Sequence, residues 1–469
     1  MWMVDAANEM KAVQLGDKRR TDRAVSIMAA LQTRPDASFP EVFGASDLEA
    51  FYRFTNNDAV AADALGAPHR VKTWSRAGGH RLRLILHDTT ELSFPGERPR
   101  TGLERRGGNS LMLSHVSLLV GGDEAPHVYG VVGCRTYVME DHLWKEALPA
   151  GELESLECGS DRWQDAVAAT TNERPVGGRV VHVMDREADD YPLWTAVIAQ
   201  GDDFVIRSAQ DRRIEGDVAL LAGALEQTPF QIQRQVWLSR RTKLRPPKER
   251  KRHPDREARY AVLSIRFGKV NVRKPRNVWK QKLPAALELY VVEVVEENAP
   301  EGAEPVHWRL LTTLPVTSAL EAAEIVDIYR KRWLIEEFFR CLKTGCNAEA
   351  RQAESREALV VTMALLLPLA VRLLQLRAAE RHAPDEAGEA LLDAVEIAAL
   401  RHLAPKAKLT ERPSNAAILH AIALVGGHLK SNGAPGCQVL WRGYTRLLRF
   451  AEGWRAALAQ LRPDAVGDS

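Results

Sequence analysis

The stretch Asp327-Ile-Tyr-Arg-Lys-Arg-Trp-Leu-Ile-Glu-Glu-Phe-Phe-Arg-Cys-Leu-Lys343 decides more about this protein than any other part of its sequence. It predicts a single helix, because neither Gly nor Pro occurs before Gly345 and because Ser318-Ala-Leu-Glu321 fits a capping box upstream. Apolar residues recur throughout the stretch, so part of this helix is expected to face a core.

Four polar side chains of the stretch are spaced three, four and seven residues apart, which places them on nearly one face of a helix. They are Tyr329, Arg332, Glu336 and Lys343. A carboxylate flanked by basic and phenolic groups suits a metal-bound polyanion such as DNA, with Glu336 on the cation and the basic groups on phosphates. The alternative is a solvated face held together by ion pairs along the helix.

The composition is that of an ordinary soluble protein, with 45% hydrophobic and 27% charged residues in a chain of 469. This length allows roughly two to four domains and a substantial core. The net charge of +2 hides an asymmetry, because residues 234–282 contain 18 Lys and Arg but only 3 Asp and Glu. This basic stretch favours a nucleic-acid partner over a membrane, and a flexible basic loop is the alternative.

The five cysteines are scattered, so neither a disulfide framework nor a zinc site is expected. The N-terminus lacks a basic segment followed by an apolar one, which predicts no secretory signal and a cytoplasmic protein. The most apolar run, residues 358–371, is too short to span a bilayer and contains Pro368, so it predicts a buried helix. We expect no membrane partner and no small-molecule substrate.

Residues 1–72 are predicted to be helical, with one helix opening near Leu15-Gly-Asp17 and another over Ser46–Phe54. Three basic residues fall on a short arc of the first helix: Arg19, Arg20 and Arg23. Such an arc suits contacts with DNA phosphates. A basic, solvated helix start is the alternative.

From about residue 80 the pattern changes to strands. The run 81–86 alternates and ends at Asp88, and residues 111–120 and 127–138 predict two more strands joined by a Gly-Gly-Asp hairpin. Helices are then expected over 162–170 and 191–200, alternating with strands over 178–184 and 204–208. Three antiparallel strands followed by alternating helices and strands predict a mixed α/β sheet.

Residues 209–305 interrupt this scheme and predict a β-rich insertion, with strands over 260–267 and 287–295 and a mobile basic hairpin tip. A further strand is expected over 307–313, before the helix that contains Glu336. Beyond about residue 375 the chain is predicted to be helical again, ending in an amphipathic stretch over 440–461.

Two acids stand at the ends of apolar strand-like runs: Asp88 after 84–86 and Asp185 after 180–184. A carboxylate just past a central strand is held rigidly and points into the crevice where ligands bind. Asp is also common in turns and helix caps, which is the structural alternative. With Glu336 packed across the same edge, three carboxylates would surround one site. Oxygen ligands suit Mg²⁺ or Mn²⁺, and two such ions activate a water or a 3′-hydroxyl.

The order of these motifs resembles the DDE-class cut-and-paste DNA transposases, and within them the insertion-sequence-four (transposon-five-like) family. The motifs are Asp88-Thr-Thr, Asp185-Arg-Glu-Ala-Asp189 and Tyr329-x2-Arg332-x3-Glu336-x6-Lys343. Shorter likenesses are Leu15-Gly-Asp-x-Arg-Arg-Thr21, Tyr52-Arg-Phe54, Phe204-Val-x-Arg-Ser208 and Ala370-Val-Arg-Leu-Leu-Gln-Leu-Arg377, so the resemblance covers nearly the whole chain.

The resemblance implies an RNase H-like catalytic domain over 73–372, with the 209–305 insertion before the third acid. An N-terminal helical domain, 1–72, would bind transposon-end DNA, and a C-terminal helical domain, 373–469, would support a homodimer on paired ends. Asp88, Asp185 and Glu336 would be the catalytic residues and the ligands of two Mg²⁺ or Mn²⁺ ions.

The resemblance also implies DNA contacts. These would come from Tyr329, Arg332, Arg340 (where the family has a Lys), Lys343, Arg207 and, at the N-terminus, Arg19, Arg20, Arg23 and Arg53. Trp308 would stack on a base flipped out during hairpin formation, and core packing is its alternative role. His115 has a family counterpart, but no role follows for it.

The implied function is a transposase that cuts transposon ends through a hairpin intermediate and joins them to target DNA. A catalytically silent DNA-end-binding or inhibitory descendant is the first alternative. A metal-dependent nuclease on the same fold, which cleaves without joining, is the second.

Overall fold

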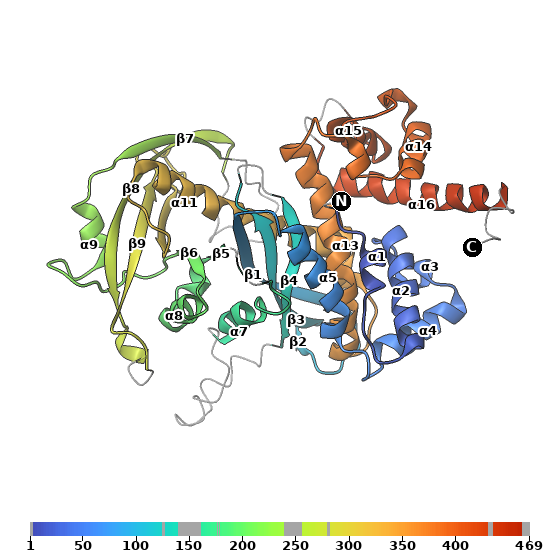
Figure 1. The fold of residues 1–469 in the computed structure, drawn as a ribbon, viewed down its shortest axis with the longest axis horizontal. Helices are drawn as coiled ribbons and strands as arrows, with labels where there is room; N and C mark the ends of the chain where they lie inside the picture. The colour runs from blue at the N-terminus through green and yellow to red at the C-terminus, as the bar shows by residue number, and fades with distance from the viewer. Residues whose placement is uncertain are drawn as a thin grey trace.

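The computed structural model describes residues 3–123, 127–138, 161–175, 177, 179–238, 256–278, 282–429 and 435–461. The protein is a mixed α/β structure with one ten-stranded sheet. Along its long axis, the N-terminal and C-terminal helices gather at one end and strands β7–β9 at the other, with β1–β6 between them (Figure 1). The strand order is β2-β3-β1-β5-β6-β10-β9-β8-β7, and β4 pairs with the outer side of β3.

The first half of the sheet matches the predicted succession of elements. Its strands are β1 (Leu82–Pro95), β2 (Glu104–Arg106), β3 (Asn109–Gly121), β4 (Val128–Tyr137), β5 (Arg179–Met184) and β6 (Asp203–Arg207). The β1–β3 and β3–β4 pairs are antiparallel, whereas β5 pairs in parallel with both β1 and β6. The short strand β2 was not predicted.

Alternation along the strands gives the sheet two apolar faces. Leu84, Leu86 and Val183 share one core cluster with α11–α13, and this side of the sheet is called the upper face below. Ile85 and Val180 belong to a second cluster under the sheet, with Trp74 of α5 (Ala62–Arg76). The lower face is also covered by α7 (Asp161–Ala169) and α8 (Tyr191–Ala199), which confirms the two predicted crossover helices.

The predicted β-rich insertion is an extension of the same sheet. It contains α9 (Leu221–Glu226), β7 (Ile232–Leu238), β8 (Arg259–Arg273) and β9 (Ala286–Val295), followed by β10 (His307–Thr312). β10 pairs antiparallel with β6 and β9, which joins the insertion to the central strands. β7 and β8 form an antiparallel pair, but the predicted basic tip, 239–255, lies outside the described residues.

The helical stretch that contains Glu336 differs from the prediction of one continuous helix. The structure has α11 (Ala319–Lys331) and α12 (Trp333–Arg340), followed by a π-helical turn over Cys341–Gly345. At Arg332 the backbone N–H bonds to Tyr329 O, only three residues back, so the hydrogen-bond pattern tightens there. The capping box of Ser318 and Glu321 is present as predicted.

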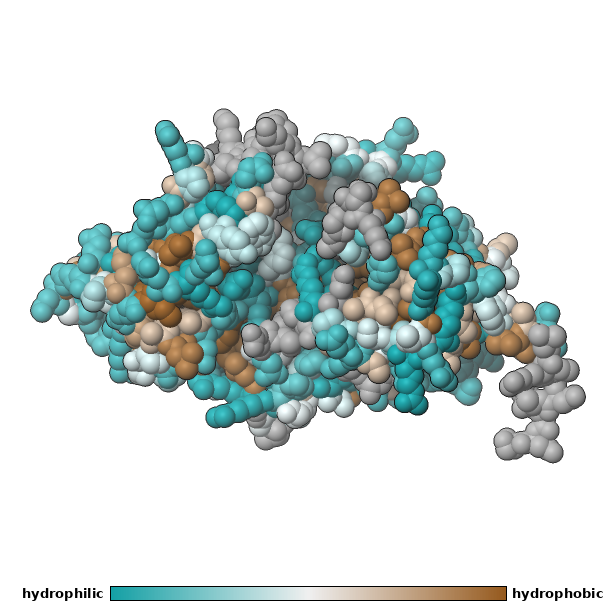
Figure 2. Space-filling view, turned by 90° about the horizontal axis from the view of Figure 1, so that it is seen from above, coloured by the Kyte–Doolittle hydropathy of each residue, from teal (hydrophilic) through white to brown (hydrophobic). Residues whose placement is uncertain are grey.

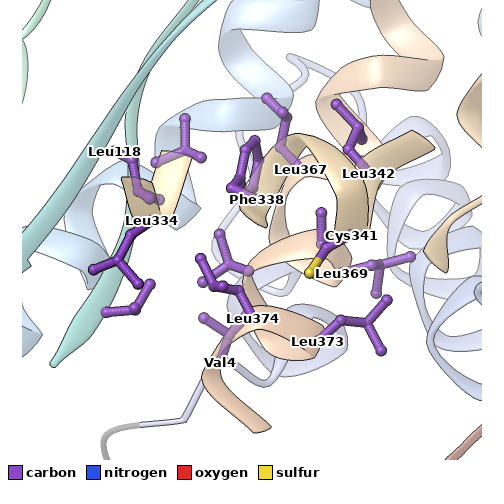
Figure 3. Packing of buried hydrophobic residues seen from close by; sticks show 14 of the residues in the cluster. Val4, Leu118, Leu334, Phe338, Cys341, Leu342, Leu367, Leu369, Leu373 and Leu374 are labelled. Carbon is purple, nitrogen blue, oxygen red and sulfur yellow. The ribbon is translucent and has the colours of Figure 1, made fainter. Parts of the chain in front are cut away.

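Helix α13 (Arg356–His382) forms the centre of the core. Figure 3 shows Leu367, Leu369, Leu373 and Leu374 of α13 around Phe338, Cys341 and Leu342, with Leu118 of β3 and Leu334 alongside. The helix is longer than predicted, and its Arg356–Ala379 part is long and apolar enough to cross a membrane. However, 83% of its apolar window is buried, as the prediction of a buried helix required.

The remaining helices gather around α13 and at the C-terminal end (Figure 1). They are α1 (Ala6–Met10), α2 (Lys18–Thr33), α3 (Phe39–Val42), α4 (Ala45–Thr55), α14 (Ala394–Leu403), α15 (Asn415–Val425) and α16 (Cys437–Leu461). Both predicted domain limits, 72 and 372, fall inside helices, α5 and α13. Seen from above, the surface is mainly hydrophilic, with hydrophobic side chains scattered among the hydrophilic ones on both sides of the molecule (Figure 2).

Candidate active site

Asp88 and Asp185 lie side by side on neighbouring strands. In the parallel β1–β5 pair Leu86 is opposite Val183, and the same register two residues further on brings Asp88 next to Asp185. Because side chains alternate, both carboxylates point to the upper face with Leu86 and Val183. Asp185 directly follows β5, where it accepts a hydrogen bond from Glu187 N, as predicted for an acid at a strand end.

The prediction that Asp88 ends its strand is wrong. β1 continues to Pro95 because β3 is long enough to pair with it as far as Asn109. Asp88 therefore lies inside a strand and pairs with Val116 of β3, so its backbone position is fixed more firmly than in a turn. Its Oδ1 also accepts a hydrogen bond from Thr89 N at 2.8 Å.

A single guanidinium joins two of the predicted catalytic acids. Arg332 donates to Asp88 Oδ2 at 2.9 Å and to Glu336 Oε1 at 2.6 Å. The side chains of Arg332 and Asp88 are 17% and 20% exposed, so this ion pair is largely shielded from water. The structure thus brings Asp88 and Glu336 to one point, beside Asp185.

Burial makes the charged form of Asp88 costly in this site. Burial, helped by the nearby charges of Asp185 and Glu336, raises the pKa of Asp88 to about 6, although Arg332 acts in the opposite direction. Burial acts to lower the pKa of Arg332, but the surrounding carboxylates raise it above its usual range. Arg332 therefore remains charged and is the cation that compensates these acids.

The acids fit a hard divalent cation in their chemistry. Oxygen donors are what Mg²⁺ and Mn²⁺ prefer. Among the described residues, however, no three His, Cys, Asp or Glu side chains are arranged so that they could hold a metal ion. In this arrangement the guanidinium of Arg332 stands between Asp88 and Glu336, where it takes the acceptor atoms that a cation needs.

An aromatic and basic group adjoins the acids on the upper face. Trp308 of β10 packs edge-on against Tyr329, with their ring centroids 5.3 Å apart. Arg207 of β6 is the strand partner of Leu310 and therefore lies on the same face as Trp308. The guanidinium groups of Arg207 and Arg332 act to lower the pKa of Tyr329, while burial, the larger effect, raises it. Trp308 is partly buried and packs against the hydrophobic core, as its alternative role requires.

The last two residues of the predicted DNA clamp lie further along the chain. Lys343, in the π-helical turn, donates to Glu91 O of β1 at 2.5 Å and lies 3.6 Å from Glu349. It therefore reaches the strand that carries Asp88. Arg340 is exposed at the end of α12.

The predicted N-terminal contacts lie on α2 and α4, at the end of the molecule opposite β7–β9 (Figure 1). Arg19 is exposed and Arg20 partly exposed. Arg23 pairs with Asp47 at 3.1 Å, and Arg53 with Glu49 at 3.5 Å. Exposed pairs of this kind contribute little to stability, so both guanidinium groups are available to phosphates.

A layer of histidines on the lower face was missed by the sequence reasoning. His87 Nε2 lies 2.8 Å from His182 Nδ1, and His115 Nε2 lies 3.5 Å from His87 Nδ1. All three imidazoles are fully buried. A usable signal was present in the sequence, because His87 and His182 interrupt the two apolar runs that lead to Asp88 and Asp185.

This layer makes the stability of the protein depend on pH. Burial lowers the pKa of His115 to about 3, with Arg162 acting in the same direction, and it lowers the pKa of His87 well below its usual value, helped by His182 and His115. In the unfolded chain both titrate near 6.5. Stability is therefore fully present above about pH 6.5 and falls on acidification, by about 1.4 kcal/mol per pH unit for each histidine.

We expect the denaturant concentration at the midpoint of unfolding to decrease as the pH is lowered from 7 to 5. His115→Asn should flatten this dependence, although the variant is less stable at pH 7. Chemical denaturation at half-unit pH intervals measures both. Equal pH slopes for the two proteins would contradict the assignment of His115 as a buried neutral group.

Two known family models match parts of this sequence. Residues 163–372 match the family model described as Transposase DDE domain, and residues 4–60 match the one described as Transposase DNA-binding. The first match contains Asp185, Trp308 and Glu336, while Asp88 lies before its start. The second contains all four predicted N-terminal arginines.

The class of protein follows from these matches. A DNA-binding domain and a DDE domain in one chain, together with a mixed α/β structure, support a DDE transposase. Such domains generally use divalent metal ions, and the DNA-binding match supports DNA as a partner.

Proposed function

We propose that this protein is a cut-and-paste transposase of the insertion-sequence-four type, which cleaves transposon ends through a hairpin and joins them to target DNA. The observation that carries the proposal is the pairing of Arg332 with both Asp88 and Glu336, because it joins two motifs that are far apart in the sequence. The mixed order of strands β4-β3-β1-β5-β6 supports an RNase H-like core for this chemistry.

In this proposal Asp88, Asp185 and Glu336 hold two Mg²⁺ or Mn²⁺ ions. The bound ions would supply activation of a water or 3′-hydroxyl and stabilisation of the leaving oxygen. Arg332 then leaves the carboxylates and takes a phosphate of the strand to be cut, since its planar fork binds phosphate as well as carboxylate. In this exchange the metal ions replace the guanidinium as the positive charge beside the carboxylates, and the phosphate becomes the new anionic partner of Arg332.

The other basic groups hold the DNA strand. Tyr329, Arg207, Arg340 and Lys343 supply phosphate contacts around the acids, and Arg19, Arg20, Arg23 and Arg53 bind the transposon end at a distance from the chemistry. These two sets lie at different parts of the molecule, and we propose that one DNA end contacts both. Two chains on paired ends, held through the C-terminal helices, complete the proposed assembly.

Trp308 is proposed to stack on a base that leaves the helix during hairpin formation. Replacing it by Ala removes one stacking surface, worth about 1–3 kcal/mol. We expect first-strand nicking to persist and hairpin formation to slow about 5- to 150-fold. Trp308→Phe keeps a ring against Tyr329 and should retain most of the activity. Denaturing gels of end-labelled DNA separate nicks from hairpins, and equal losses of both products in Trp308→Ala would indicate a packing role only.

A cleavage and joining assay tests the proposed function itself. The full chain is incubated with labelled linear DNA bearing the ends of its own element, Mg²⁺ and a target plasmid. Hairpin ends and joined products are the expected result. DNA binding without cleavage would favour the silent end-binding protein, and nicks without joining would favour a nuclease.

A further inference from the structure

A hydroxyl–imidazole pair lies directly beneath the Asp88 position. Thr89 of β1 and His115 of β3 are opposite one another in the antiparallel register, and Thr89 Oγ1 lies 2.9 Å from His115 Nδ1. Because Asp88 points to the upper face, its neighbour Thr89 points to the lower one. Leu118 of β3 lies with Leu334 of α12 in Figure 3, on the upper side, so His115 three residues earlier falls on the lower side by the same alternation.

The imidazole of His115 is fixed by its neighbours. It is fully buried, and the indole of Trp163 from α7 packs edge-on against it with a centroid distance of 4.7 Å. Its Nε2 faces His87 Nδ1, which also lies 3.1 Å from Ser117 Oγ. An imidazole fixed in this way has little freedom to turn.

The tautomers of the three histidines follow from the contact of His182 with Asp202. The Asp202 carboxylate, bound by both terminal nitrogens of Arg174 at 2.7 Å, accepts from His182 Nε2 at 3.3 Å. His182 Nδ1 is then an acceptor for His87 Nε2–H, and His87 Nδ1 in turn is an acceptor. With a proton on its own Nε2, His115 presents a bare Nδ1 to Thr89, so the hydroxyl of Thr89 donates to it.

Thr89 therefore forms hydrogen bonds with groups on both faces of the sheet. Its hydroxyl is bound below by His115, while its backbone N–H donates to Asp88 Oδ1 above at 2.8 Å. Rotation or displacement of Thr89 would loosen the bond that orients the Asp88 carboxylate. Hydrogen bonds behind a metal-binding carboxylate commonly set its direction and its affinity.

We propose that His115 and Thr89 are positioning residues that hold the Asp88 carboxylate in its productive orientation from the opposite side of the sheet. The inference rests on the proposed role of Asp88 in metal-dependent DNA cleavage. It gives His115, whose role the sequence left open, a task that does not involve contact with DNA or metal.

The test compares Thr89→Val, Thr89→Ser and the full-length parent protein. Valine keeps the shape but removes the hydroxyl, whereas serine keeps the hydroxyl. Thr89→Val should weaken Mn²⁺ binding, measured by calorimetric titration without DNA, and slow single-turnover cleavage, each about 10- to 100-fold. Binding of the labelled DNA end should stay unchanged. Thr89→Ser should restore both Mn²⁺ affinity and rate to within about threefold of the parent.

Ser117→Ala is the matched control, since it removes a buried hydroxyl from the same layer without touching the Thr89–His115 pair. It should leave Mn²⁺ affinity and cleavage unchanged. The inference is overturned if Thr89→Val binds Mn²⁺ and cleaves like the parent, if Thr89→Ser fails to rescue, or if Ser117→Ala loses as much. A parent protein that binds Mn²⁺ but cuts no DNA would instead refute the proposed function, and the Mn²⁺ titrations would still decide the positioning role.

Discussion

Replacing Glu336 by Gln is expected to abolish DNA cleavage while leaving DNA binding intact. The amide keeps the size of the side chain and can still accept from Arg332, but it has no charge with which to hold a divalent cation. A loss of at least about 10³-fold, or about 4 kcal/mol of transition-state stabilisation, is expected for a ligand that acts only in the chemical step. Single-turnover cleavage of end-labelled DNA, beside a gel-shift titration, measures the two effects separately.

Glu324→Gln is the control for this experiment, since Glu324 is an exposed acid on the neighbouring helix α11. It should cleave like the parent. Thermal unfolding of both variants verifies that they fold. A folded Glu336→Gln protein that cleaved at the parent rate would remove Glu336 from the site and leave its contact with Arg332 as a structural ion pair.

Local pattern predicted most of the framework of this protein. The apolar runs before Asp88 and Asp185 identified β1 and β5, and the capping box at Ser318 identified the start of α11, because these features depend on residues close in sequence. The resemblance then predicted Glu336 as the third acid. Neighbouring parallel strands bring their ends together, so the meeting of Asp88 with Asp185 also followed from topology.

Contacts between distant segments could not be predicted in this way. Asp88 lies within β1 rather than at its end, because the length of β1 depends on pairing with β3, and the sequence near Asp88 contains no sign of that partner. The spacing from Arg332 to Glu336 suggested an ion pair along the helix. The same guanidinium also binds Asp88, 244 residues earlier, which only the packing of α12 over β1 determines.

Removing Arg332 has the second large expected effect, and it acts on stability, metal binding and catalysis together. In Arg332→Ala the carboxylates of Asp88, Asp185 and Glu336 lose the cation that compensates them, and the pKa of Asp88 rises further as a result. We expect the free energy of unfolding at neutral pH to fall by about 1–3 kcal/mol, less than for a fully buried pair because the site is partly open to water.

A divalent ion should reverse this loss, because it replaces the missing positive charge. Mn²⁺ at about 100 times its dissociation constant would stabilise the variant by about 2.7 kcal/mol. The gain should be larger in Arg332→Ala than in the parent, where the guanidinium competes for Asp88 Oδ2 and Glu336 Oε1. Thermal unfolding with and without Mn²⁺ measures both terms, and cleavage should remain low since the proposed phosphate contact is lost.

Arg330→Ala provides the comparison, since Arg330 is an exposed arginine two residues away that pairs with Asp327 on its own helix. It should change neither stability nor the response to Mn²⁺ by a measurable amount. Arg332→Ala could instead be as stable as the parent and gain no extra stability from Mn²⁺. This result would show that the carboxylates do not need a compensating positive charge. The guanidinium would then contribute neither to stability nor to the charge balance of the site, and the proposed exchange of Arg332 from carboxylate to phosphate would have no basis.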